Sequence, residues 1–260
     1  FFESPLATGL LPSPPTPEMS EVNIDVKSVF AEFLGTLLFQ FLGGACAANS
    51  SLKGADSLGG LVTAALGNGL ALAVCIYCTA KVSGGHLNPA VSTGFLASQA
   101  LGDKFDLRTY LGYVIAQIVG ALLGAVFLWL ALPSSMLGHT NSFATVGTLS
   151  QRHPMAVFLW EFLGTFTLVF TVFGVVHSEG AAATGPLAIG LSLTAGVFAT
   201  GPYTGGSLNP ARTLAPAIVY GVWTHIWVYL LATLLAGACA GYLYKAAFVP
   251  QKQQYDQMQS

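Results

Sequence analysis

Charged residues are scarce in this sequence. Only 8% of its 260 residues are Asp, Glu, Lys or Arg, and the formal net charge at pH 7 is −2. A soluble domain carries about 25% charged residues, so this composition excludes a disordered chain, a coiled coil and almost every soluble enzyme of this length. It also offers no basic surface for nucleic acid. With 53% hydrophobic residues, the composition indicates an integral membrane protein.

Cysteine is scarce too. The four cysteines, Cys46, Cys75, Cys78 and Cys239, fall inside apolar stretches rather than in loops, so we predict buried hydrophobic side chains and no disulfide framework. Cys75 and Cys78 lack the second pair or the histidines that a zinc site needs. The sequence also shows no Ser-His-Asp set and no phosphate-binding loop. It therefore predicts no enzyme, no cofactor and no metal.

The apolar residues form six segments long enough to cross a bilayer. A spanning helix needs roughly 20 mostly apolar residues, and candidates lie at about 29–49, 59–80, 108–131, 155–177, 185–203 and 223–247. Two shorter stretches, at about 89–99 and 210–220, each follow an asparagine and begin with Pro-Ala. At about 1.5 Å per residue they give roughly 16 Å of helix, half of a hydrocarbon core. We predict an all-α membrane protein with six transmembrane helices and two half-helices.

Two motifs occur twice and in the same order. Glu32–Thr36 and Glu161–Thr165 both read EFLGT, and Gly84–Ala90 (GGHLNPA) differs from Gly205–Ala211 (GGSLNPA) at one position. Matching motifs in matching order indicate a duplicated unit. Because each unit holds three spans, the second copy is inverted, and its re-entrant half-helix meets the first one near the midplane of the membrane. The predicted fold is an inverted three-plus-three repeat.

Asparagine followed by proline is typical of a helix N-terminus. If Asn88 and Asn209 cap the half-helices through their side-chain oxygens, each NH2 group is fixed as a donor that points away from its helix. Two such donors, at the positive ends of two helices, would hold one water molecule by its oxygen and repel cations. For a single motif, the alternative is a capped surface turn. The two motifs are Asn88-Pro89-Ala90 and Asn209-Pro210-Ala211.

The paired Asn-Pro-Ala motifs, the arginine that follows the second one (Arg212) and the repeated EFLGT closely resemble the aquaporins, or major intrinsic proteins. The resemblance covers roughly 28–247, and the segment Gly84–Ala90 looks most like the plant tonoplast-intrinsic branch. It implies a right-handed six-helix bundle that assembles as a homotetramer in the lipid bilayer, with one pore in each protomer. The implied function is passive conduction of water or small neutral solutes.

The same resemblance sets the domain organisation. The channel domain is expected at 28–247, with repeat one at about 28–131 and repeat two at about 155–247. The tails at 1–27 and 248–260 are polar and expected to be mobile and cytoplasmic, an orientation that places most Lys and Arg residues inside. Residues 1–18 are either a remnant of a targeting segment or a stretch before an alternative start at Met19. A vacuolar or other intracellular membrane and the plasma membrane are both left open.

Family alignment places a narrow selectivity filter at Asn68, Val197, Gly206 and Arg212. A strict water pore of this family has Phe, His and a small residue at the first three of these positions, so this chain lacks both the ring and the imidazole. The resemblance implies a filter that is wider and less polar, passing water and also ammonia, urea, hydrogen peroxide or glycerol. The alternative is that neighbouring side chains refill the gap and that only water passes.

Two glutamates lie inside predicted spans at equivalent positions of the repeats. A carboxylate in a membrane suggests a proton relay, but Glu32 and Glu161 can instead accept N–H groups of the re-entrant loops, as the family uses them. We expect this structural role, with His86 bonding the loop backbone; gating through protonation of His86 is the alternative. Inverted repeats also build coupled transporters, which would need an ion site that the sequence does not offer beyond these two glutamates.

Overall fold

The computed structural model describes residues 24–51, 58–99, 105–137, 153–181 and 183–250. The elements of these ranges are the helices α1 (Val26–Ser51), α2 (Leu58–Ser83), α3 (Pro89–Ser98), α4 (Leu107–Ala131), α5 (Ser134–Leu137), α6 (Pro154–Val176), α7 (Gly185–Thr204), α8 (Pro210–Tyr220) and α9 (Ile226–Phe248). Each predicted span and half-helix corresponds to one of them, with shifted ends, and the short α5 was not predicted. The predictions for residues 1–23 and 251–260 lie outside the described ranges.

Five helices, α1, α2, α4, α6 and α9, are long and apolar enough by length and composition to cross a membrane. The sixth predicted span is α7, which has 20 residues but is rich in Gly, Ala and Thr. It packs against α2 and α6, so part of its surface faces protein rather than lipid. Its exposed face carries Leu187, Leu191 and Phe198. Its buried face combines small residues such as Gly190 and Thr194 with Ile189, Leu193 and Val197, and small residues allow membrane helices to pack closely.

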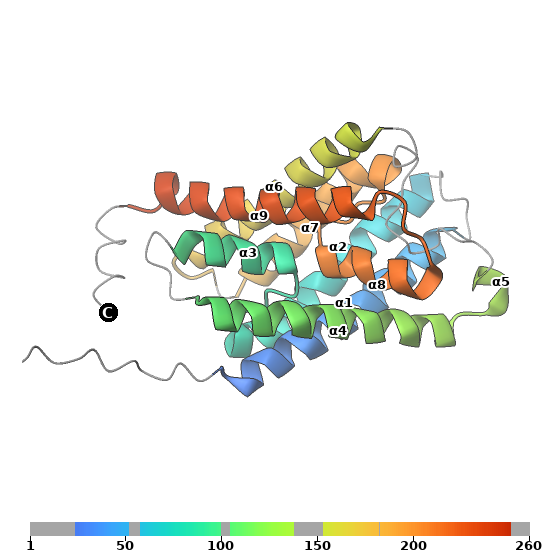
Figure 1. Ribbon diagram of the computed structural model, residues 1–260, viewed down its shortest axis with the longest axis horizontal. Coiled ribbons are helices and arrows are strands. Elements are labelled where there is room, and N and C mark those ends of the chain that lie inside the picture. The colour runs from blue at the N-terminus through green and yellow to red at the C-terminus, as the bar shows by residue number, and fades with distance from the viewer. Residues whose placement is uncertain (1–23, 52–57, 100–104, 138–152, 182, 251–260) are drawn as a thin grey trace, which may run out of the picture.

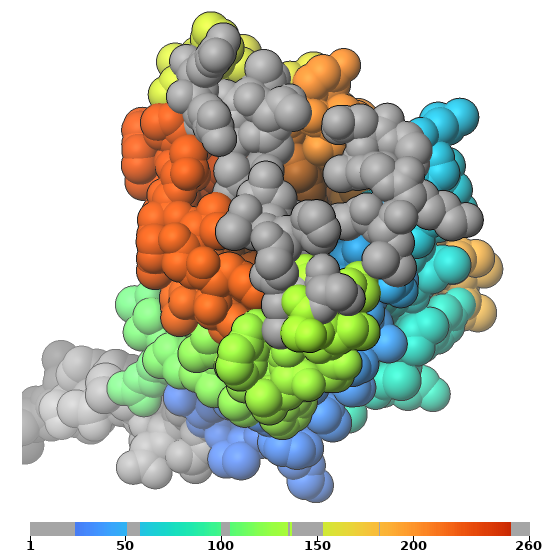
Figure 2. Space-filling view, turned by 90° about the vertical axis from the view of Figure 1, so that its right-hand side faces the viewer, coloured from blue at the N-terminus to red at the C-terminus, as the bar shows by residue number. Residues whose placement is uncertain are grey.

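The helix packing is itself repeated. In repeat one α1 contacts α2 and α4, and in repeat two α6 contacts α7 and α9. Each half-helix packs mainly against a helix of the other repeat, because α3 packs mainly on α9 and α8 packs mainly on α4. Figure 1 shows α3 and α8 in line in the middle of the bundle, between α9 and α4. Viewed from the end that carries α5, α9 lies on one side of the molecule and α1 and α2 lie on the other (Figure 2).

Two glycines mark the place where the repeats meet. Gly69 of α2 and Gly190 of α7 approach so closely that a Cβ on either one would clash with the backbone oxygen of the other. The neighbours correspond as well, since Gly69 faces Thr194 and Gly190 faces Ala73. Such reciprocal contacts are expected where inverted copies meet on their pseudo-two-fold axis. The contacts support the duplication inferred from the motifs.

Glycines also bring α3 against α9. A Cβ on Gly237 would clash with the backbone of Ala90, and a Cβ on Gly241 would clash with the backbone of Gly94. Small residues allow two helix backbones to come this close within a membrane. The contact positions the first turn of α3, which is the turn that Asn88 caps.

We expect Gly237→Ala to reduce the yield of folded protein strongly, because the added methyl group meets backbone atoms that cannot rotate away. Overpacking costs about 1–3 kcal/mol where neighbours can shift, and more where they cannot. Gly59→Ala is the matched control, since Gly59 is also helical but no described residue lies within 4 Å of the added Cβ. Melting temperatures and size-exclusion profiles in detergent measure both variants, and equal behaviour would refute the packing argument.

The prediction for the cysteines is only partly right. All four are free, Cys75 is buried and Cys46 is half-buried, but Cys78 and Cys239 are exposed. These two lie on the outward faces of α2 and α9, which the apolar run of each helix did not reveal. In a membrane such a face meets lipid, where a thiol behaves as a small apolar group.

Candidate functional site

Both re-entrant loops have the same backbone conformation. All four glycines of Gly84–Gly85 and Gly205–Gly206 have positive φ, between 61° and 88°. Leu87 and Leu208 follow with φ of 49° and 54°, a left-handed conformation that is uncommon for a residue with a side chain. Strained conformations of this kind persist only where the surroundings hold them. The surroundings of the two loops are also alike.

A buried glutamate holds each loop. Glu32 accepts hydrogen bonds from the two backbone N–H groups of His86–Leu87, at 2.9 and 2.7 Å. Glu161 accepts the equivalent bonds from Ser207–Leu208, at 3.0 and 2.9 Å. Both glutamates are fully buried. Their carboxylates therefore satisfy backbone donors that would otherwise be unpaired in the interior.

The glycine of each EFLGT motif makes room for the leucine of the loop. A Cβ on Gly35 would lie 2.5 Å from Cδ2 of Leu87, and a Cβ on Gly164 would lie 2.5 Å from Cδ2 of Leu208. The two motifs thus act together: the glutamate binds the loop backbone, and the glycine three residues later receives the loop side chain. This contact explains why the motifs recur as a pair.

Four further residues brace the loops and were not predicted as part of the site. The hydroxyls of Ser83 and Thr204 each donate to the glutamate of their repeat at 2.6 Å. Tyr113 donates to the carbonyl of Ser83 at 2.9 Å, and Tyr229 donates to that of Thr204 at 2.7 Å. Ser83 and Thr204 directly precede the repeated motif, so a comparison extended by one residue would have found them. The tyrosines come from α4 and α9, and only the fold brings them here.

His86 distinguishes repeat one. Its backbone N–H donates to Glu32, but its ring bonds a side chain of α3 rather than the loop backbone: Nδ1 lies 3.0 Å from Oγ of Ser92. The ring is buried and stacks on Phe95 with centroids 4.5 Å apart. Gln117 of α4 joins this network by donating to Glu32 at 2.7 Å and to Ser92 at 3.0 Å.

Each asparagine caps its half-helix. Oδ1 of Asn88 accepts the N–H of Ala90 at 2.9 Å. Oδ1 of Asn209 accepts the N–H groups of Ala211 at 2.9 Å and of Arg212 at 3.2 Å. In both cases the proline takes the first helical position. The caps have the geometry that the Asn-Pro-Ala spacing predicts.

The two asparagines also tie the half-helices together. Nδ2 of Asn88 donates to the carbonyl of Leu208 at 2.8 Å, and Nδ2 of Asn209 donates to the carbonyl of Leu87 at 2.9 Å. The tips of the half-helices therefore touch, as the inverted repeat requires. One N–H of each amide is used in this contact, and the other is left as a donor, because an amide NH2 carries two.

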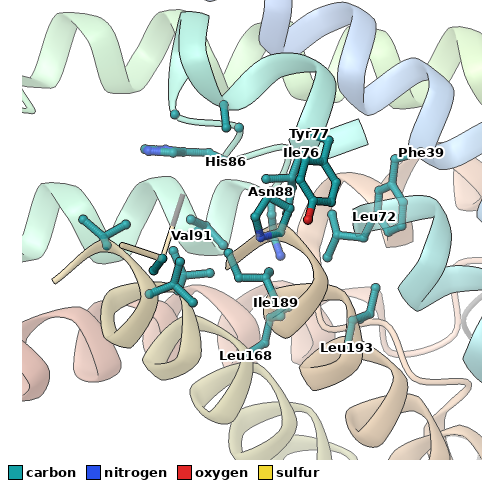
Figure 3. A pocket seen from close by; sticks show the side chains of 18 of the residues that line it. Phe39, Leu72, Ile76, Tyr77, His86, Asn88, Val91, Leu168, Ile189 and Leu193 are labelled. Carbon is teal, nitrogen blue, oxygen red and sulfur yellow. The ribbon is translucent and has the colours of Figure 1, made fainter. Parts of the chain in front are cut away.

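A cavity of about 470 Å³ extends from the asparagine pair to the turn between α6 and α7. Its walls are largely apolar, and Figure 3 shows Ile76, Ile189 and Leu193 among the side chains around Asn88. Polar groups line it at the two asparagines, at the loop 84–86 and at Tyr77, Lys81 and Ser178. The cavity thus combines largely apolar walls with a small number of polar groups.

The four predicted filter residues lie next to one another, and none of them lines this cavity. Nε of Arg212 donates to Oδ1 of Asn68 at 3.2 Å, and Nη1 donates to the carbonyl of Gly206 at 2.7 Å. Val197 flanks Gly206, because a Cβ there would lie 3.3 Å from Cα and Cγ2 of Val197. The Gly206 carbonyl is thus engaged by the guanidinium.

Comparison with known proteins gives a consistent answer. The family model described as Major intrinsic protein matches residues 18–244. The chain is 36% identical over 226 residues to aquaporin-4 of Mus musculus, covering 86% of this chain and 68% of that protein. It is also 36% identical over 234 residues to the probable aquaporin TIP2-2 of Oryza sativa subsp. japonica, covering 86% and 88%. Equal identity to both gives no preference for the tonoplast-intrinsic branch.

A solved structure agrees with the sequence relatives. The fold is similar to the X-ray structure of the aquaglyceroporin from Plasmodium falciparum, with a TM-score of 0.76 and 28% identity over 88% of this chain and 98% of that one. The match includes nearly all of the other protein, so the whole bundle is shared. The chain belongs to the aquaporin, or major intrinsic protein, family, and it is a multi-pass integral membrane protein.

Proposed function

We propose that the chain is a passive channel that conducts water and small neutral solutes and excludes protons and other cations. The observation that carries this proposal is the tip-to-tip contact of the half-helices. There, Asn88 and Asn209 bond across to the opposite loop and line the cavity with their amides. Irregular backbone at this depth is tolerated where it lines a water-filled path.

The cavity suits rapid passage. Water held by many polar groups would leave slowly, whereas conduction requires binding that is favourable enough to enter and weak enough to leave. Here polar contacts come from the loop 84–86, the asparagine pair and the side chains of Tyr77, Lys81 and Ser178, and the other walls are largely apolar. Each solute molecule would exchange a few hydrogen bonds with the wall as it moves.

Cation exclusion would arise from fixed positive potential along the path. The N-termini of α3 and α8 both point to the asparagine pair, and each carries a partial positive charge. Arg212 adds a full charge, and all three acceptors that the described structure gives its side chain are neutral oxygens. A cation would lose hydration and meet the positive charge of Arg212.

The filter supports a solute range beyond water. Asn68 and Val197 stand where a strict water pore has an aromatic ring and an imidazole, and Gly206 adds no side chain. We infer that ammonia, urea, hydrogen peroxide or glycerol also pass. The narrower alternative, a strict water channel, would require the surrounding side chains to close the gap.

Coupled transport would need an ion site at an intramembrane carboxylate. Glu32 and Glu161 are occupied by loop donors, which leaves no ion site at the two intramembrane carboxylates. We propose a homotetramer, as in the resemblance, with 28–247 as the channel domain of each protomer. Exposed apolar side chains on α1, α2, α6 and α7 provide surface for lipid and for neighbouring protomers.

Stopped-flow swelling of proteoliposomes tests the proposal. With the purified protein incorporated, we expect fast shrinkage in an impermeant osmolyte and solute-driven swelling in at least one of urea, glycerol or an ammonium gradient. Water flux without any solute flux would indicate a strict water channel, the narrower alternative. Water permeability equal to that of empty liposomes, with folded protein present, would refute the channel function.

A further inference from the structure

The side chain of Arg212 reaches from one repeat to the other. Two of its acceptors, the carbonyls of Gly206 and Ser207, belong to its own loop, at 2.7 and 3.5 Å from Nη1. The third, Oδ1 of Asn68 at 3.2 Å from Nε, lies on α2 in repeat one. Asn68 is fully buried and Arg212 is 7% exposed. Among the described contacts of this arginine, the acceptor on Asn68 is the one that belongs to repeat one. Its position therefore does not depend on the loop of repeat two.

Asn68 is itself held in one orientation. Its Nδ2 donates to the carbonyl of Ala64 at 2.8 Å and to that of Gly43 at 3.2 Å. Turning the amide over would place Oδ1 against two carbonyl oxygens and NH2 against the guanidinium, so both sides would repel. The backbone acceptors therefore fix Oδ1 toward Arg212. Gly43 is part of this arrangement, because a Cβ there would lie 2.5 Å from Oδ1.

Resting on the channel function proposed above, we propose that Asn68 is a positioning residue that holds the Arg212 guanidinium without neutralising it. A neutral amide oxygen gives Nε a directed partner and leaves the positive charge intact. A carboxylate at the same place would bind Nε at least as well but would cancel the charge. The identity of residue 68 as an amide thus determines how strongly cations are excluded, independently of pore width.

The test compares cation leak with water flux in one set of proteoliposomes. Asn68→Asp changes little in size, introduces a negative charge beside Arg212 and removes the donor to Gly43 and Ala64. With an entrapped Na⁺-sensitive dye, we expect its ratio of Na⁺ to water permeability to rise at least about tenfold, because the added carboxylate offsets the charge of Arg212. Asn49→Asp makes the same chemical change at an exposed site on α1 and should leave the ratio unchanged.

A second variant keeps the proposal testable if a buried Asp impairs folding. Gly43→Ala adds no charge and lies outside the cavity lining, but its methyl group would press on Oδ1 of Asn68. It should raise the Na⁺ to water ratio in the same direction by a smaller factor. A purely structural role for Asn68 would lower the amount of folded channel without moving this ratio.

The outcomes separate this inference from the channel function. A wild-type protein that passes no water, or that passes Na⁺ freely, overturns the proposed function. A wild-type channel that passes water and excludes Na⁺, together with folded Asn68→Asp or Gly43→Ala variants whose ratio stays within about twofold of it, overturns the role of Asn68 alone.

Discussion

Glu161→Ala and Glu32→Ala are expected to reduce folded protein to below about a tenth of the wild-type yield, each through its own re-entrant loop. Removal of Glu161 leaves the N–H groups of Ser207–Leu208 without their acceptor, whereas the hydroxyl of Thr204 keeps the carbonyl of Thr200 at 3.1 Å. An unsatisfied buried donor costs about 1–3 kcal/mol, so two of them cost about 2–6 kcal/mol, a large part of the stability of a typical domain, about 5–15 kcal/mol. Detergent-solubilised yield and melting temperature measure the loss.

Two controls sharpen this prediction. Glu161→Gln keeps one acceptor oxygen and presents NH2 to the remaining donors, so its yield should fall between those of the wild type and of the alanine variant. Glu179→Ala removes an exposed glutamate from the turn after α6 and should leave yield and melting temperature unchanged. A Glu161→Ala protein that folds normally, with a flux that no longer responds to a proton gradient, would favour the relay interpretation.

The fold was predictable from the sequence because two independent signals agree. Apolar length gives the spans, and the recurrence of EFLGT and of the Asn-Pro-Ala motif gives the inverted pairing of repeats. The caps on α3 and α8 were predictable for the same reason, since N-capping depends on residues adjacent in sequence. The length signal is weakest at α7, where packing against α2 and α6 favours small residues over strongly apolar ones.

Contacts between distant segments were not predictable. Tyr113 and Tyr229 have no local feature that links them to the loops, and Gly237 shows its purpose only when α3 lies against it. The alignment identified Asn68 and Arg212 as neighbours in a filter but could not show which atoms meet. The orientation of the Asn68 amide depends on carbonyls of Gly43 and Ala64, and backbone carbonyls carry no sequence signature.

In the filter, Val197→His is expected to reduce the flux of urea and glycerol at least about tenfold. A change of about one methylene in a binding pocket gives ~10–200-fold discrimination between substrates, and the expected reduction lies in that range. Val197 contacts the Gly206 position, so a larger ring there takes up space beside Gly206 and narrows the filter. The imidazole also offers a hydrogen-bonding group to water. Water flux should therefore fall much less than solute flux.

Position 197 gives a cleaner test than position 68. Asn68→Phe would add bulk as well, but it would remove the acceptor of Arg212 Nε and so change width and charge placement together. Val197→Leu is the matched control, because it adds similar bulk without a polar group. It should reduce solute flux as His does and reduce water flux more. Stopped-flow measurements on both variants distinguish width from polarity, and urea and glycerol fluxes unchanged in both would place the narrowest part of the path elsewhere.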